Sequence, residues 1–343
     1  MEMHDIARVL RASEKAESGP QGSLTETIAF LASCKVLVVG AGGLGCEILK
    51  NLAYSGFKNI TVVDMDTIDV SNLNRQFLFT SSDVGSFKSI VAAQAINERC
   101  EHLGVRCEGK SCRIEELDAS FFSQFLLIIA GLDNIAARRW LNSTLFDLVS
   151  RDANGVVDPS SLKFFLDGGT EGFKGQARVI IPTMTACFEC TLDTFPPTTT
   201  YPLCTIAEMP RLPEHCVEYA FTVLWGLEFG ERKFDPDNES DVDWVFQAAA
   251  ARGNSFNIEG VTLQLTRGVV KRIVPAVAST NALIAAVLVN EAFKIATYAN
   301  PVMNNYFMYM GEVGANSETI PYEKSEACLV CGGAREVGSL DSS

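Results

Sequence analysis

The chain has 343 residues, 47% of them hydrophobic, which predicts about two packed domains and excludes a wholly disordered chain. Its 42 acidic residues outnumber 28 basic ones, and the formal net charge is -14. This balance argues against a nucleic-acid-binding protein, which needs a basic surface, and suits a partner with a basic face.

The N-terminal segment and the most apolar segment of the chain bear on the location of the protein in the cell. Residues 1–24 are charged and polar and contain no apolar run of the signal-peptide type. The segment 273–289 is strongly apolar, but Pro275 and Asn281 interrupt it, which favours a buried helix over a membrane span. We therefore expect no membrane association and a cytoplasmic or nuclear protein, in which cysteines stay reduced.

The first strong motif is a glycine-rich turn. A β-branched run at 35–39 is followed directly by Gly40, Gly42 and Gly45, and then by a helical pattern. Such glycines let backbone N–H groups and a helix N-terminus approach phosphate oxygens, although a purely structural turn is the alternative. Asp64 ends the next strand, where a carboxylate can bind a ribose hydroxyl. These residues alone do not separate a dinucleotide from ATP.

A dense polar and cationic set after the second strand favours ATP. It consists of Asn72, Arg75, Gln76 and Lys88. Cations at the carboxyl edge of a sheet can neutralise a triphosphate and its leaving pyrophosphate. For any one of these residues, the alternative is a solvated loop with incidental charge.

Asp133 follows a third apolar strand, within 125–134. A carboxylate at the carboxyl end of a strand can hold Mg²⁺. The alternative is that Asp133 caps the helix that follows.

Strands that alternate with helical stretches predict an α/β fold with a doubly wound, mainly parallel sheet of the Rossmann type. Five prolines between residues 194 and 216 interrupt this pattern, and mainly helical stretches follow. The expected parts are a flexible segment 1–24, a first α/β part 25–192, a helical insert 193–259, a second α/β part 260–332 and a flexible tail 333–343.

Two Cys-x-x-Cys pairs predict a structural zinc site in a reducing compartment. They are Cys187 with Cys190, and Cys328 with Cys331. Redox chemistry or unpaired structural thiols are the alternatives.

Two further cysteines raise the question of chemistry. Cys216 follows His215, but adjacent helical residues point apart, which favours packing. Cys204 lies between Pro202 and Pro210, and we expect it in an exposed loop. From this pattern alone, a cysteine without a role is the preferred interpretation.

Between about residues 25 and 332, the order of motifs resembles the ubiquitin-activating enzyme family. The motifs are "VVGAGGLGCEILKNLAYSGF", "VVDMDTIDVSNLNRQFLF", "GLDN", "CFEC", "PLCTIAEMPRLPEHC" and "PAVASTNALIAA". The resemblance implies an adenylation domain with an inserted catalytic-cysteine domain. It implies that a ubiquitin-like modifier is adenylated with ATP and then held on Cys204 as a thioester.

The resemblance also implies roles for the other residues. The three glycines match the ATP loop, Asp64 the ribose ligand, and Asp133 the magnesium ligand. The residues on the phosphate side are Asn72, Arg75, Gln76 and Lys88. Arg178 stands where neddylation-type members have arginine, which favours a Nedd/Rub-type modifier, and the segment 167–181 matches the region that the modifier's tail enters.

The implied partners are an inactive regulatory subunit that forms a heterodimer, and a conjugating enzyme. The alternatives are a SUMO-type or ubiquitin-type activating subunit and a non-catalytic adenylation-like scaffold. A dehydrogenase is less favoured. Two features depart from the family. The ubiquitin-fold domain that usually follows is not in the sequence, and Phe87 stands where proline is common before Lys88.

Overall fold

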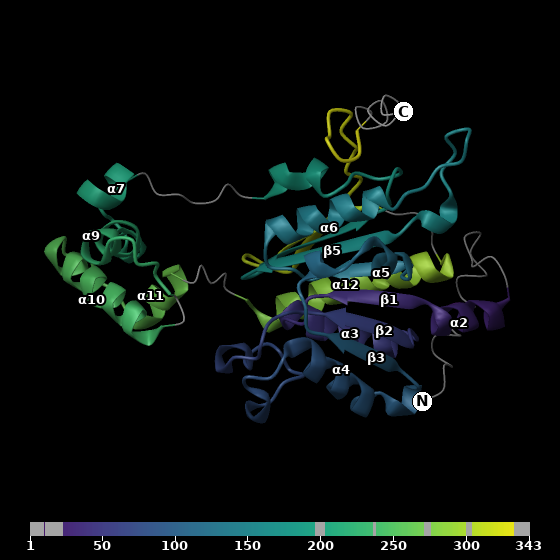
Figure 1. Cartoon of the computed structure of the whole chain (residues 1–343), viewed down its shortest axis with the longest axis horizontal. Coiled ribbons are helices and arrows are strands. Elements are labelled where there is room, and N and C mark those ends of the chain that lie inside the picture. The colour runs from purple at the N-terminus through teal and green to yellow at the C-terminus, as the bar shows by residue number, and fades with distance from the viewer. Residues whose placement is uncertain are drawn as a thin grey trace. The chain divides into compact units, whose positions relative to one another are not determined.

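The computed structural model describes Leu10 and residues 23–195, 203–235, 238–270, 276–299 and 304–332, with the backbone alone at 203–205. Most of the expected flexible segment 1–24 and all of the tail 333–343 lie outside the described residues. Two compact units emerge, one formed by Met1–Phe195 with Ala276–Ser343 and the other by Pro196–Pro275. Figure 1 labels many of their elements.

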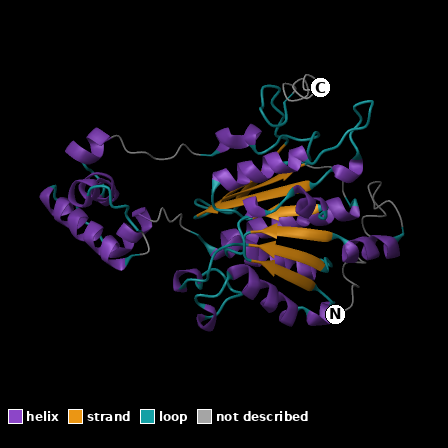
Figure 2. Cartoon of the chain, viewed as in Figure 1, coloured by secondary structure: helices purple, strands orange, loops and turns teal. Residues whose placement is uncertain are grey.

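The first unit is built on a sheet with eight strands among the described residues, in the order β3-β2-β1-β4-β5-β6-β7-β8 (Figure 2). The strands are β1 (Lys35–Val39), β2 (Asn59–Val63), β3 (Arg106–Lys110), β4 (Leu127–Ala130), β5 (Phe164–Glu171), β6 (Lys174–Ile180), β7 (Tyr306–Met310) and β8 (Asn316–Ile320). Pairing is parallel from β3 to β5 and antiparallel from β5 to β8. The prediction of a doubly wound, mainly parallel sheet is confirmed.

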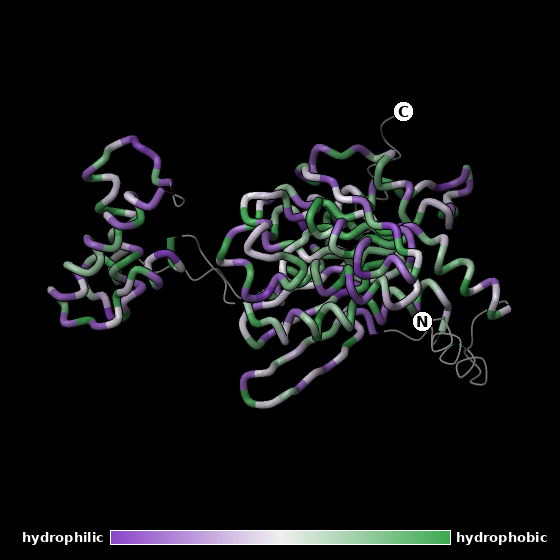
Figure 3. Tube along the Cα trace, turned by 90° about the horizontal axis from the view of Figure 1, so that it is seen from below, coloured by the Kyte–Doolittle hydropathy of each residue, from purple (hydrophilic) through white to green (hydrophobic). Residues whose placement is uncertain are grey.

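Helices cover both faces of this sheet. They are α2 (Leu24–Ser33), α3 (Gly43–Tyr54), α4 (Lys88–Arg99), α5 (Ala119–Ser123), α6 (Ile135–Asp147) and α12 (Ala278–Thr297). Successive strand residues point to opposite faces. Val36 and Val38 therefore pack with α3, α4 and α12, whereas Leu37 and Val39 pack with α5 and α6. Figure 3 shows hydrophobic segments gathered in the interior of this unit.

Short turns connect these elements. The 3₁₀ turns are Val70–Asn72, Ser81–Asp83, Glu101–Leu103, Ile114–Glu116, Pro159–Ser161 and Glu189–Thr194. Among the described residues, we find no helix with both the length and the apolar character needed to cross a bilayer.

The second unit is helical. It contains α7 (Leu203–Glu208), α8 (Pro213–Tyr219), a π-helical turn (Ala220–Leu224), α9 (Trp225–Phe229), α10 (Glu239–Ser255) and α11 (Leu263–Val270). Its core includes Val217, Trp225 and Val245. The unit continues beyond residue 259, the end expected from the sequence, because α11 packs against α8 and α10.

Candidate functional site

The glycine turn lies where the order of strands reverses. β1 leads to β2 and β3 on one side, whereas its other neighbour β4 leads to β5. In doubly wound sheets, ligands bind at this switch point, beyond the carboxyl ends of the strands. Gly40 follows β1 and Gly131 follows β4, so their backbones meet at this edge.

Two of the glycines are required by close backbone approach. Gly40 has a φ of 98°, and a Cβ there would lie 2.8 Å from the carbonyl oxygen of Gly131. A Cβ on Gly45 would lie 2.0 Å from the carbonyl oxygen of Gly40. Gly42 is the N-cap of α3 and provides no side-chain cap, so the first N–H groups of α3 can face a ligand. This geometry fits a phosphate cradle.

Asp64 connects the end of β2 to the glycine turn. Its Oδ2 accepts a hydrogen bond from the Ala41 amide at 2.6 Å, and its Oδ1 accepts one from the Asp66 amide at 2.8 Å. Burial raises the pKa of the Asp64 carboxyl, and these two hydrogen bonds oppose that rise. The carboxylate therefore stands beside the cradle, at the position expected for a ribose ligand.

Lys88 is held in place at the same edge. It is the first residue of α4, directly after the N-cap Phe87, so the departure at Phe87 leaves Lys88 at a helix start. The side chain is largely buried, and its Nζ lies 2.8 Å from Asp66 Oδ2. A lysine that can exchange this partner for a phosphate oxygen fits the expected role.

Arg75 and Gln76 lie against the glycine turn. Arg75 Nη1 donates to the Ser71 carbonyl at 3.0 Å, and Arg75 Cγ would be 3.4 Å from a Cβ on Gly43. Gln76 is buried, its Nε2 would be 3.9 Å from a Cβ on Gly42, and its Oε1 has no hydrogen-bond partner among the described residues. A buried orphan acceptor is costly, so Gln76 fits a site that takes a polar ligand.

Asn72 has a local structural bond. Its Oδ1 accepts a hydrogen bond from the Asp69 amide at 3.1 Å and thereby closes the turn Val70–Asn72. Asn72 stays a predicted phosphate-side residue, and this turn places Arg75 and Gln76 after it.

Asp133 is exposed at the carboxyl end of β4, two residues after Gly131. It is not the helix cap, the alternative considered from the sequence. Asn134 is the N-cap of α6, and its Oδ1 accepts a hydrogen bond from the Ala137 amide at 2.7 Å. Asp133 Oδ1 accepts one long hydrogen bond, at 3.5 Å from Asn134 Nδ2, so this exposed carboxylate at the switch point has the chemistry of a magnesium ligand.

Sequence reasoning missed two buried side chains that join the parts of this site. Asn281, near the start of α12, accepts a 2.6 Å hydrogen bond from Thr170 in β5, and its amide packs on Gly43. Arg138 of α6 donates to the Leu132 and Gly168 carbonyls, the second at 2.9 Å. The only available signal was the polar break at Asn281 in an apolar helix.

Arg178 is enclosed rather than exposed. Its side chain is 2% exposed, and its Nη1 lies 2.9 Å from Asp167 Oδ2. Its Nη2 donates to Gln176 and Thr194, and its guanidinium packs on the rings of Phe188, Phe195 and Tyr306. Burial lowers the pKa of Arg178, whereas Asp167 opposes that shift. Selection of a modifier by direct charge repulsion would need an accessible guanidinium, and that of Arg178 is buried.

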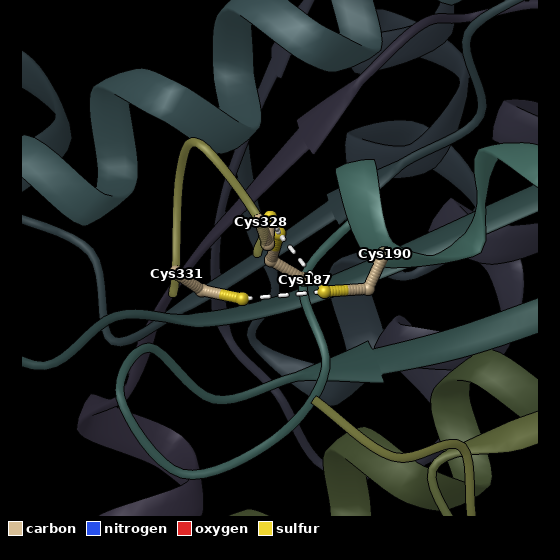
Figure 4. A group of neighbouring side chains, drawn as sticks. All are labelled: Cys187, Cys190, Cys328 and Cys331. Carbon is tan, nitrogen blue, oxygen red and sulfur yellow. Dashed lines mark hydrogen bonds between the residues drawn. The ribbon is translucent and has the colours of Figure 1, made fainter. Parts of the chain in front are cut away.

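The four zinc-candidate cysteines converge although the two pairs are far apart in the sequence (Figure 4). The Sγ–Sγ distances are 3.5 Å for Cys187 and Cys328 and 3.3 Å for Cys190 and Cys331, and all four sulfurs lie within 4.8 Å of one another. Sulfurs at about 2.3 Å from one tetrahedral ion are about 3.8 Å apart. The cluster therefore fits a closed Cys₄ zinc site.

Cys204 lies in a helix and not in the irregular loop expected from its proline neighbours. It is the second residue of α7, because the segment between Pro202 and Pro210 is long enough for one helical turn and more. Cys216 is fully buried in α8, and burial raises the pKa of its thiol. His215 accepts a hydrogen bond from the Arg211 amide, so its Nδ1 is not directed at Cys216.

The chain has known relatives over most of its length. The chain matches the ThiF family over residues 23–330. A solved structure of Escherichia coli MccB with MccA-N7isoASN shares the fold, with a TM-score of 0.54 and 19% identity, covering 90% of this chain and 70% of that one.

Sequence relatives show which group within the ThiF family the chain resembles. The chain is 53% identical over 305 residues to a NEDD8-activating enzyme E1 catalytic subunit of Dictyostelium discoideum, which covers 87% of this chain and 68% of that protein. It is 46% identical over 340 residues to the subunit of Schizosaccharomyces pombe, covering 93% and 74%, and 39% identical to that of Saccharomyces cerevisiae, covering 87% and 97%. The chain therefore belongs to the ThiF family and, within it, to the NEDD8-activating enzyme E1 catalytic subunits.

Proposed function

We propose that this chain activates a NEDD8-type ubiquitin-like protein by adenylating its C-terminal carboxylate and then holding it on Cys204 as a thioester. The observation that carries the proposal is the glycine cradle at the switch point, with Asp64, Lys88 and Asp133 placed around it. Family membership supports ATP as the nucleotide.

In the first step, the modifier's carboxylate oxygen attacks the α-phosphate of ATP. A new P–O bond forms, the bond between the α-phosphate and the bridging oxygen breaks, and pyrophosphate leaves. Lys88 and Arg75 would stabilise the charge that develops on the phosphates. Asp133 would hold Mg²⁺, which supplies further charge neutralisation when bound.

In the second step, the Cys204 thiolate attacks the acyl carbonyl of the adenylate. A C–S bond forms, AMP leaves with the C–O bond electrons, and the thiol proton passes to solvent or a base. A thiol with an ordinary pKa near 8.5 is only a few per cent ionised at neutral pH, so the reaction needs surroundings that favour the thiolate.

Zinc would be structural in this scheme. Cys187 and Cys190 follow β6, and Cys328 and Cys331 follow β8, so one ion would tie two distant segments beside the sheet. Four sulfur ligands leave no open position for catalysis.

A regulatory subunit that forms a heterodimer, a conjugating enzyme that receives the modifier, and a cytoplasmic or nuclear location complete the proposal. SUMO-type and ubiquitin-type activation and a non-catalytic scaffold are the alternatives. The scaffold is disfavoured because the chain retains both the nucleotide residues and Cys204.

The test is to incubate the chain and its regulatory subunit with ATP, Mg²⁺ and, in separate reactions, NEDD8, ubiquitin and SUMO. We expect a conjugate on the chain that reductant cleaves, formed fastest with NEDD8. Faster formation with ubiquitin or SUMO would overturn the choice of modifier, and failure with all three would overturn the activity.

A further inference from the structure

The helix that carries Cys204 is too short to be stable by itself. α7 has six residues, and isolated helices of fewer than about 12 residues are marginal in water. Its geometry must therefore come from contacts with the rest of the second unit. One such contact is apolar, since Ile206 is buried.

The second contact is a cation at the C-terminal end of α7. Arg252 of α10 donates from its Nη2 to the carbonyl oxygens of Ile206 at 2.7 Å and Ala207 at 2.5 Å. The last carbonyls of a helix have no partner within the helix, and an arginine is well suited to bind them. One side chain thus satisfies two acceptors in the last turn.

Arg252 is itself held firmly. Its guanidinium carbon lies 3.7 Å from the ring centroid of Tyr219 in α8 and 4.9 Å from that of Phe256. Its Nε is buried and has no hydrogen-bond partner among the described residues. Burying an unpaired donor costs free energy. The hydrogen bonds of Nη2 and the contacts of the guanidinium with the two rings offset this cost and hold the side chain in place.

We propose that Arg252 is a positioning residue for thioester formation. It ties the end of α7 to α8 and α10 and thereby fixes the backbone of Cys204, two residues before Ile206. The inference rests on the proposed role of Cys204. Arg252 does not touch the reacting atoms. It acts through the helix, because an end that frays would let the thiol leave its position for attack.

The test compares Arg252→Met, which keeps an apolar stem but removes the donors, with Arg252→Lys, which retains a cationic donor. The full chain with its regulatory subunit is used. For Arg252→Met we expect thioester formation to slow about tenfold to a hundredfold, since small misplacements have effects of this size. ATP–pyrophosphate exchange should stay unchanged, and Arg252→Lys should restore part of the thioester rate.

Amide hydrogen exchange followed by mass spectrometry separates positioning from general destabilisation. In Arg252→Met, we expect residues 203–208 to lose protection while α8 and α10 keep theirs. Arg267→Met is the matched control, because Arg267 of α11 makes an exposed ion pair of 3.5 Å with Glu239 in the same unit. This control should change neither readout.

Three results would count against the inference. A wild-type thioester rate in Arg252→Met overturns it. A slower rate accompanied by lost protection throughout α8 and α10 shows a role in stability alone and also overturns it. If Cys204→Ala still forms a reducible conjugate, the proposed function fails first, and the inference fails with it.

Discussion

At the scale of single residues, the nucleotide edge, meaning the edge of the sheet around the glycine cradle, has the side chains that a polar ligand requires. The buried Gln76 Oε1 has no hydrogen-bond partner among the described residues, and Lys88 forms an ion pair with Asp66. Gly40 and Gly45 permit close backbone approaches that any side chain would prevent. The sequence predicted these residue types, since glycine spacing and local charge are visible in it. It could not predict Arg138 or Asn281, because their partners lie far away along the chain.

The first residue-scale prediction concerns Lys88. Lys88→Met and Asp133→Ala should each lower modifier-dependent pyrophosphate exchange by about a hundredfold or more, because groups aimed at developing charge have effects of this size. Lys50→Met is the control, since Lys50 is half exposed and pairs with Glu47 in α3. Exchange within twofold of wild type in the folded Lys88 and Asp133 variants would contradict both assignments.

The second residue-scale prediction concerns Arg178. Arg178→Gln should lower the free energy of unfolding by about 3 kcal/mol, because it removes a partner of the buried Asp167 carboxylate. Urea unfolding measures this change. Arg138 also contacts Asp167, at 3.4 Å, so the loss should grow when Arg138→Gln is combined with it. An unchanged urea midpoint would show that the Arg178 pair contributes nothing.

The same variant addresses modifier choice. If Arg178 acts on selection, Arg178→Gln should raise the rate of ubiquitin activation relative to that of NEDD8. Because the guanidinium is enclosed, we expect any such effect to come through the packing of β5 and β6 and to accompany the loss of stability.

At the scale of elements, hydrophobic patterning predicted the central strands of the sheet and the helix that follows the glycine turn. The apolar runs at 35–39 and within 125–134 became β1 and β4, and the helix predicted after the glycine turn became α3. The proline-rich stretch was harder, since prolines at 202 and 210 exclude long regular structure and yet permit the six-residue α7. The end of the insert was placed too early because α11 has an apolar pattern that does not reveal which core it joins.

The element-scale prediction concerns zinc. The purified chain should contain one zinc per molecule, and chelation should lower the melting temperature, because the ion would tie the segment after β6 to that after β8. Cys331→Ser should reproduce the effect of chelation. Cys112→Ser, at a half-buried cysteine outside the cluster, is the control. A folded wild-type chain without metal would contradict the assignment.

At the scale of the whole molecule, the proposed function assigns different steps to the two units. The nucleotide edge belongs entirely to the first unit, whereas Cys204 and Arg252 belong to the second. Composition and order of motifs predicted this division, and the relatives place the chain among the NEDD8-activating catalytic subunits. The two steps should therefore be separable by single substitutions in either unit.

The most direct test of the account is to measure both steps in Cys204→Ala. The chain and its regulatory subunit would be mixed with ATP, Mg²⁺ and NEDD8, and pyrophosphate exchange and reducible conjugate would be followed in parallel with wild type. The account predicts exchange close to the wild-type rate, because Lys88, Arg75 and Asp133 are untouched, and no conjugate on the chain. A reductant-sensitive conjugate on Cys204→Ala, or loss of exchange in a folded protein, would contradict it.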